Sequence, residues 1–547
     1  MSVVTTTLTS ESVVIGADVC QLTAMDIRRE VNRIPRANLV LSDGDAAESE
    51  FVVSNSGHFA PGKEIEIKLR YEDEPESEST VFKGLVMRHN VSASNKSAYL
   101  SVELKDAAVK LTKGRKSAVF IDQADSQIIE QLVEAAGLKK GIIDATRPTH
   151  AHIVQYHCTD WDFILSRAEA QGLLVSAEDG KLSVRSVDLT KPAKRTHQFK
   201  YGENIYDLEF SLDAEEQCQA VNTSAWNIKE NKMTKPRKAA SFVLAQGDLN
   251  GEKIARDVGF QPRQLLNQAP LAPEELQDWA NGQLMRSRLS MIRGTLSVKG
   301  LADIKLLDTI AIDGIGKHFN GNTVVTGICH RIDGNNGWFT DIQFGLSARS
   351  FALTEDIQEA PAAGLLPGVN GLHIAIVDNF EEDPDKQFRV KVILPTIGEK
   401  DATLWARLAS PDAGNGRGWF FRPEPGDEVI VGFFNNDPRQ PVILGALFSP
   451  TNQPPKQVAD KNPTKAIVSK TGSMIGFTDE EKGLIFIETA EGASMVIDDD
   501  AKSFEFCDQN GNQFKMNDSG ISLKSAKDFK LEASGNVVIK GAKVDIK

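Results

Sequence analysis

The sequence is poor in the features that mark several classes of protein. Its five cysteines (Cys20, Cys158, Cys218, Cys329 and Cys507) are odd in number and include no CxxC pair, which argues against a disulfide framework and a zinc site. No stretch approaches the roughly 18 apolar residues of a membrane span, and the first 20 residues lack the basic start and apolar run of a signal peptide. We therefore expect reduced thiols in a chain that is made in the bacterial cytoplasm.

The chain also has no excess of basic charge, since 76 acidic residues outnumber 62 basic ones. The chain carries a formal net charge of -14 and has a pI near 5.3. Binding to a phosphate backbone requires a basic face, so these values argue against a nucleic-acid partner. At 547 residues, with 41% hydrophobic and 25% charged residues, the chain has an ordinary globular composition and enough length for about three or four domains.

The motifs of common enzyme classes are absent or incomplete. No HExxH or GxSxG pattern occurs. GHFAPGKE (57–64) matches GxxxxGK, but Glu64 stands where Ser or Thr would hold Mg²⁺ and an alternating strand follows, so we interpret it as a hairpin turn. His150 and His152 share a strand face near His157 without a matching carboxylate or thiolate, which leaves a metal site as the weaker interpretation. We predict no enzyme activity, no catalytic residue, no cofactor and no metal.

Hydrophobic periodicity predicts a mainly β fold with a few helices. EIEIKLRY (64–71) and AYLSVELK (98–105) alternate as half-buried strands do, and strands resume over 308–345. Helices are predicted at 125–137, with Asp125 or Ser126 as the N-cap, at 159–172, with Thr159 and Asp162 as a capping box, and from 273 to about 291.

Two linkers divide the chain. Residues 359–371 (EAPAAGLLPGVNG) and 449–465 (SPTNQPPKQVADKNPTK) have the Ala, Pro, Gly and Asn content of domain boundaries. They separate a first region over 1–358, which we expect to split into two subdomains near 110–200, from a region at 372–448. That region has short alternating strands between turn signals, which is typical of a small antiparallel barrel.

The tail, 466–547, is a repeat. About ten strand-like segments recur roughly every eight to ten residues between Gly, Asn, Asp or Ser: AIVS, SMIGF, LIFIE, SMVI, SFEF, QFKM, ISLK, FKLEA, NVVIK and KVDIK. Such a ladder has an apolar face and almost no helical material to cover it within one chain. Three intertwined copies would close it into a prism without free edges, so we predict a homotrimeric β-helix or β-prism needle.

The barrel region resembles the OB-fold of VgrG proteins and of myophage tail spikes, which form the puncturing centrepiece of contractile injection systems. The resemblance rests on DNFEEDPDKQFRVKVILP (378–395) and on WARLASPDAGNGRGWFFRPEPGDEVIVGFFNNDPRQPVILGALF (405–448). Its structural motif residues are Arg417, Gly418, Trp419, Phe420, Phe421, Pro423, Gly426, Asp427 and Glu428. Weaker patterns at 81–91, 156–174 and 318–342 look like the hub of the same family, and the tail looks like its needle.

The resemblance implies a structural homotrimer. Its hub would meet the inner tube protein and baseplate proteins, its OB-fold would form a collar, and its needle would contact the target membrane transiently. In the family a PAAR-type protein caps the needle, which implies a tip contact at Val544, Ile546 and Lys547. The chain would be assembled into the injection particle and delivered or released outside the cell. The aromatic residues of the motif region would be divided between the barrel core and contacts to neighbouring chains or to the start of the needle.

Other functions stay open. A trimeric receptor-binding fibre or adhesin would share the repeat tail but has no reason to carry the hub patterns. A peptidoglycan-acting tail enzyme would need a further domain, for which the linker at 449–465 is too short. An OB barrel can also stack bases or sugars on exposed aromatic residues.

Overall fold

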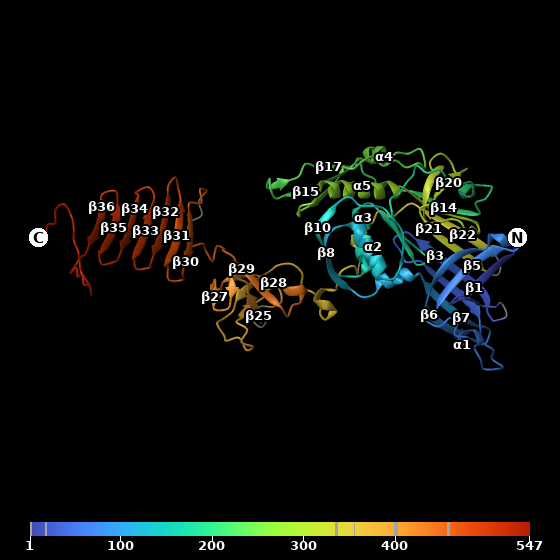
Figure 1. The fold of residues 1–547 in the computed structure, drawn as a ribbon, viewed down its shortest axis with the longest axis horizontal. Helices are drawn as coiled ribbons and strands as arrows, with labels where there is room; N and C mark the ends of the chain where they lie inside the picture. The colour runs from blue at the N-terminus through green and yellow to red at the C-terminus, as the bar shows by residue number, and fades with distance from the viewer. Residues whose placement is uncertain (1–2, 17–18, 334–336, 355, 399–402, 457–459) are drawn as a thin grey trace. The chain divides into compact units, whose positions relative to one another are not determined.

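The computed structural model describes residues 3–16, 19–333, 337–354, 356–398, 403–456 and 460–547. The chain divides into two compact units, Met1–Glu359 and Ala360–Lys547 (Figure 1). Among the described residues, no helix is long and apolar enough to cross a membrane. Residues 334–336, within the strand region predicted at 308–345, lie outside the described part.

A sheet of 13 strands forms most of the first unit. Its main path runs β14-β19-β22-β21-β3-β4-β7-β6-β5-β1-β2, and β20 pairs with both β21 and β13. Antiparallel pairing of β21 with β3, from Gly327 opposite Glu30 to Asp333 opposite Ala24, joins the two ends of this unit. The strands are β1 (Val4–Ser10), β2 (Val13–Val14), β3 (Gln21–Glu30), β4 (Arg36–Ser42), β5 (Glu64–Tyr71), β6 (Ser79–Ala93), β7 (Ala98–Lys105), β13 (Gln198–Lys200), β14 (Asp207–Leu212), β19 (Ile292–Lys299), β20 (Thr309–Asp313), β21 (Gly321–Asp333) and β22 (Gly337–Phe344).

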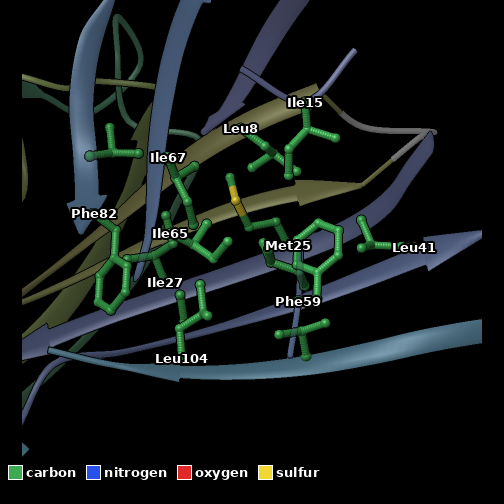
Figure 2. Close-up of a cluster of buried hydrophobic side chains, with 14 of the residues drawn as sticks. Leu8, Ile15, Met25, Ile27, Leu41, Phe59, Ile65, Ile67, Phe82 and Leu104 are labelled. Atoms are coloured by element: carbon green, nitrogen blue, oxygen red, sulfur yellow. The ribbon is translucent and has the colours of Figure 1, made fainter. Parts of the chain in front are cut away.

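The strands of this sheet bury one face, as their alternation predicts. In β5, Ile65, Ile67 and Leu69 are fully buried, whereas the charged residues between them lie on the other face. Figure 2 shows the resulting core, in which Met25 and Ile27 of β3 point toward side chains of β5.

Two of the predicted helices pack in the middle of the first unit, as α2 (Asp125–Ala135) and α3 (Asp160–Ala170). Thr159 caps α3 as predicted, because its hydroxyl accepts a hydrogen bond from the backbone N–H of Asp162 at 3.1 Å. The predicted cap of α2 is wrong: its N-cap is Ala124, because the Asp125 carboxylate is buried against Arg167. The short strands here are β8 (Lys116–Ala124), β9 (Lys139–Ile143), β10 (Thr149–Cys158), β11 (Leu174–Glu178) and β12 (Lys181–Arg185).

The third predicted helix is α5 (Pro273–Leu289), which packs on β15 (Val221–Asn227). Gly282 of α5 lies against Gly172, and a Cβ on either residue would lie within 2.9 Å of the other residue's Cα. This close approach requires glycine on both sides. The shorter α4 (Gly251–Val258) was not predicted; the very short helix α1 (Val52–Asn55) and strands β16 (Lys232–Met233), β17 (Arg237–Lys238) and β18 (Arg263–Asn267) complete the unit.

A closed five-stranded barrel begins the second unit. It consists of β23 (His373–Val377), β24 (Val390–Ile393), β25 (Thr403–Leu408), β28 (Glu428–Phe433) and β29 (Pro441–Ala446), in the order β23-β24-β25-β29-β28. The predicted barrel is confirmed, with one difference: β25 and β29 pair in parallel. Val429 and Val431 are fully buried in its core and Phe433 packs beside them, as the alternation of this strand predicts.

The tail forms a seven-stranded antiparallel sheet in which each strand pairs with the next (Figure 1). Its strands are β30 (Thr464–Val468), β31 (Met474–Asp479), β32 (Gly483–Glu488), β33 (Ser494–Asp498), β34 (Ser503–Cys507), β35 (Gln513–Asn517) and β36 (Gly520–Lys524). Seven of the ten predicted strands are therefore present. The prediction is wrong for FKLEA, NVVIK and KVDIK, because a strand needs a backbone partner and residues 525–547 form no strand within this single chain.

His330 of β21 generates a prediction about pH. Its side chain is 1% exposed, and burial, assisted by the positive charges of Arg29 and Lys305, lowers its pKa from 6.5 to about 3. Below pH 6.5 the unfolded chain binds a proton that the folded chain does not, so this residue should remove about 1.4 kcal/mol of unfolding free energy per pH unit down to about pH 3. Denaturant unfolding between pH 7 and pH 4.5 should show that slope reduced in His330→Gln. The more exposed His58→Gln should keep it, and an unchanged slope in His330→Gln would contradict the assignment.

Candidate functional site

One face of the tail sheet is almost entirely apolar. The pairing register places one residue of each strand in a continuous row across all seven strands: Ile467, Ile475, Ile487, Met495, Phe506, Phe514 and Leu523. A second row on the same face contains Lys465, Phe477, Ile485, Ile497, Phe504, Met516 and Ile521. We call these two rows together the needle face; Lys465 is its only charged member, and every other member is apolar.

None of the described residues covers the needle face. Ile475 is 50% exposed and Phe477 51% exposed, although both lie in an interior strand of the sheet. Part of the face forms an open groove of about 610 Å³, which Phe529 borders from beyond β36. A contiguous apolar surface of this kind marks a protein–protein contact.

The opposite face of the sheet is apolar near β30 and polar near β36. Its central row begins with Ala466, Gly476, Phe486 and Val496 and ends with Glu505, Lys515 and Ser522. Glu505 and Lys515 form an ion pair of 3.0 Å. The needle face is therefore the only one of the two faces that is apolar over its whole described length.

Three five-residue turns, which connect neighbouring strands at one end of this sheet, contain the same hydrogen bond. In residues 469–473, 489–493 and 508–512 the first side chain accepts a hydrogen bond from the fifth backbone N–H, at 3.1, 3.0 and 2.9 Å. In the last of these turns, the hydrogen bonds from Asn512 and Asn510 lower the pKa of Asp508 to about 2. The signal in the sequence is a Ser, Thr or Asp three residues before a Gly, which the spacing of the strands alone does not reveal.

The residues predicted to contact a tip protein lie beyond the sheet. Val544 is 50% exposed and Ile546 is 91% exposed, and neither belongs to a strand. Lys547 is also exposed. The structure therefore presents these side chains without assembling them into a defined pocket.

The OB-fold motif begins with a tight hairpin. β26 (Ala413–Gly414) pairs with β27 (Arg417–Gly418), and the Arg417 guanidinium donates to both carboxylate oxygens of Asp412 at 2.6 Å. Gly418 has a φ of 135°, and a Cβ there would lie 2.3 Å from the Asp412 carbonyl oxygen. The Trp419 N–H donates to that same oxygen at 3.0 Å, which fixes the direction in which the chain leaves the hairpin.

The three aromatic residues after this hairpin point away from the core. Trp419 is 53% exposed, Phe420 88% and Phe421 61%. Of the aromatic residues in this region, Phe433 packs on the core as predicted, while Phe434 is also exposed. The predicted contacts to neighbouring chains or to the start of the needle stay a prediction.

The rest of the motif builds the turn into β28, which begins at Glu428. Pro423 precedes a turn in which the Glu424 N–H donates to the Asp427 carboxylate at 2.9 Å. Gly426 has a φ of 90°, as a turn glycine requires, and its N–H donates to the carbonyl of Val377 at 2.9 Å. These residues therefore have structural roles at the base of the aromatic segment.

A second ordered loop of the barrel was not identified from the sequence. The Asp383 carboxylate accepts hydrogen bonds from the backbone N–H groups of Asp385, Gln387 and Arg389 and from the Arg389 side chain. The Arg389 guanidinium holds the pKa of Asp383 well below its usual range. At the tip of this loop Phe388 has a φ of 59° and is 94% exposed, an uncommon conformation for a bulky residue.

The enzyme-like candidates have structural explanations. His150 Nε2 lies 3.1 Å from the buried carboxylate of Asp125, which also binds Arg167 and Gln171. No group of three or more potential metal ligands was found among the described residues, and His152 is exposed on the same strand. In GHFAPGKE, Gly62 has a φ of 93° and Glu64 begins β5, so this segment is a turn, as predicted.

Gly418 generates a prediction about the barrel. Gly418→Ala should reduce the unfolding free energy of the barrel by about 1–3 kcal/mol, because the new Cβ meets the Asp412 carbonyl and the backbone lies in a region reserved for glycine. Gly416→Ala is the matched control: Gly416 also has a positive φ, of 69°, but nothing lies within 4 Å of its Cβ position. Thermal unfolding of both variants measures the difference, and equal losses of stability would contradict the role of the clash.

Two family models match the chain. Residues 1–334, more than half of the 547, match the Alg8 N-terminal domain. Residues 373–448 match the Type VI secretion system/phage-baseplate injector OB domain, which covers the closed barrel described above.

Curated relatives include spike proteins of type VI secretion systems and one toxin. The chain is 22% identical over 540 residues to the type VI secretion system spike protein VgrG1a of Pseudomonas aeruginosa, covering 89% of this chain and 78% of that protein. It is 25% identical over 418 residues to the actin cross-linking toxin VgrG1 of Vibrio cholerae, covering 70% of this chain but 36% of that protein. The chain thus spans about a third of the length of that toxin.

Among solved structures, the 43 kDa tail protein of prophage MuSo2 from Shewanella oneidensis superposes with a TM-score of 0.47 at 12% identity. The superposition covers 63% of this chain and 99% of the tail protein. A TM-score below 0.5 supports no argument about function. The family models and the curated relatives, together with the barrel and the mainly β fold, carry the assignment: the chain belongs to the Alg8 N-terminal domain family and is a VgrG-like spike protein.

Proposed function

We propose that this protein is the structural, homotrimeric spike and baseplate hub at the tip of a contractile injection system. In this role the first unit connects to the inner tube, the barrel forms a collar, and the tail sheet forms a membrane-puncturing needle. The observation that carries the proposal is the needle face, whose apolar side chains cross all seven strands without cover from their own chain.

The needle face favours self-association over a small ligand. Its two rows run through every strand, so an occupant must match the whole length of the sheet, and identical copies of the sheet do so. Three copies arranged around an axis would bury all three faces together and close into a prism, which is the arrangement that the likeness to spike proteins supports. Such a core would give a rigid element without compliant loops on its inner side.

A mechanical role also agrees with the chemistry of the chain. The relatives are mostly spike proteins, and the one whose name describes a toxin is much longer than this chain. We propose that this chain has no enzyme activity of its own. His150, which was considered above as a metal ligand, lies against Asp125 of α2 and so joins two secondary-structure elements.

The partners follow from this role. We propose that the first unit contacts the inner tube protein and baseplate proteins, and that the needle contacts the target membrane transiently. A PAAR-type tip protein at Val544, Ile546 and Lys547 is a further proposal, supported by the exposure of the two apolar side chains. The particle would be assembled in the cytoplasm and delivered or released outside the cell.

The mass of the purified chain tests the proposal first. Light scattering after size exclusion should give about 3 × 59.7 = 179 kDa for the full chain. Phe477→Asp should shift the protein toward the monomer by at least ten-fold in assembly equilibrium, because it places a carboxylate from every copy among buried apolar residues.

Thr478→Asp is the matched control, since residue 478 is the next residue of the same strand but lies on the opposite face. It should keep the trimer mass. A monomeric wild type, or equal effects of the two substitutions, would overturn the proposed needle. Binding of the isolated trimer to cells would favour the adhesin instead, and clearing of a peptidoglycan suspension would favour an enzyme.

A further inference from the structure

The segment predicted as a linker, 359–371, contains a loop that packs on the barrel. Pro361–Gly364 form a single helical turn, which lies against the turn Phe434–Asn436 between β28 and β29. Ala362 is only 1% exposed. We call residues 361–369 the docked loop.

The docked loop has a strained backbone. Ala362 and Ala363 have φ values of 52° and 54°, and Gly364 follows with 72°, so three successive residues are left-handed. This conformation brings the Cβ of an L-residue too close to the backbone, a cost that only glycine escapes. Two successive alanines therefore adopt it only while the surrounding contacts hold them there.

Few contacts hold the loop in this conformation. In the described part of the chain, one hydrogen bond joins the docked loop to the barrel: the Val369 N–H donates to the carbonyl of Asn436 at 2.9 Å. The Leu365 N–H donates to the carbonyl of Ala362 at 3.0 Å, but that bond lies within the loop. The burial of Ala362 and one bond to the barrel thus oppose the strain of two alanines.

The chain is held more firmly on both sides of the loop. On the side of the first unit, the Arg115 guanidinium donates to the carbonyls of Asp356 and Ile357 at 2.7 and 3.0 Å. On the other side, β23 pairs with β24 and with β28 in the closed barrel. The docked loop is therefore less restrained than either of its neighbours along the chain.

We propose that the docked loop is a joint that opens on its own, while the first unit and the barrel stay folded. Opening relieves the strain of Ala362 and Ala363 and frees nine residues, which span at most about 30 Å when extended. Segments with few buried contacts are those that open locally. In the proposed spike, the joint would let the barrel move relative to the first unit without unfolding either one.

Hydrogen exchange in the full-length protein tests whether the loop opens independently. After correction for intrinsic rates, the amides of Leu365 and Val369 should exchange at least about 100-fold faster than those of β28, because local opening costs less free energy than unfolding the barrel. Equal protection of the two segments would overturn the joint, since the loop would then open only with the barrel. Exchange of Val369 at the rate of an unstructured peptide would overturn the docking.

Ala363→Gly tests the strain. Ala363 is exposed, so this substitution removes the Cβ that opposes the left-handed backbone without removing packing. The closed loop should become more stable, and the Val369 amide should exchange at least about three-fold more slowly, with β28 unchanged. Ala363→Val should have the opposite effect, because a β-branched side chain is more strained at this φ.

Ala360→Gly is the matched control. Ala360 is also exposed, but its φ of -59° is one that alanine adopts without strain, so the substitution should not slow the exchange of Val369. Equal effects of Ala360→Gly and Ala363→Gly would overturn the role of the strain. These measurements apply to a monomer as well as to a trimer, so a failure of the proposed spike and a failure of the joint are separate results.

Discussion

The structure depends on one constraint: the needle face cannot be buried by the chain that carries it. Alternation within each strand puts apolar residues on one side, and the register of six successive antiparallel pairs aligns them in two rows. A single sheet that exposes such a face is only marginally stable. In the proposed trimer its folding would be coupled to association. The stability of this region is then a function of protein concentration, as it is for obligate oligomers.

The first unit differs from the tail sheet, because its own chain covers its apolar core. Its sheet is continuous through the β3–β21 pair, so the two ends of the unit share one backbone network. Arg29 of β3, only 4% exposed, donates to Glu178 and Asp179 at 3.1 and 3.2 Å and to the carbonyl of Val81. One buried cation thereby joins the main sheet to the turn between β11 and β12. Glu178 also pairs with Lys305, so loss of Arg29 would chiefly remove the partner of Asp179 and of the Val81 carbonyl.

Periodicity predicted most of the elements, because alternation and capping are local. EIEIKLRY became β5, and Thr159 began α3 as its N-cap, since both signals require only neighbours in the sequence. The capping box itself is not formed, because the Asp162 carboxylate accepts from the Thr159 hydroxyl and not from its backbone N–H. Asp125 was misjudged for the converse reason: whether a carboxylate caps its own helix or binds Arg167 of another depends on tertiary packing. Four features were not predicted: α4, the Gly-containing turns of the tail, the Asp383 loop and the exposure of Trp419 to Phe421. Each depends on tertiary packing or lies in a short element.

The last three predicted strands show that local composition does not by itself produce a strand. FKLEA, NVVIK and KVDIK have the same composition as the segments that became β30–β36, yet they remain outside the sheet. Composition specifies which residues favour an extended backbone, but not which chain supplies the hydrogen bonds.

The segment by which the chain leaves the first unit is held more firmly than a flexible connector would need. Arg286 of α5 donates to the carbonyls of Ser347 and Arg349, and its partner Glu169 of α3, 2.7 Å away, accepts from the backbone N–H of Phe351. The pair is largely buried, with both side chains about one-tenth exposed, so its attraction is little screened by water.

Further along, Arg115 donates to the carbonyls of Asp356 and Ile357. Backbone groups at several points between 347 and 357 are thus bonded to side chains of two helices and of the strand region near β8. A pull on residue 359 would have to break these bonds one after another before it reached the core of the unit. That arrangement suits the proposed spike, in which the first unit would have to carry the tail sheet without unfolding.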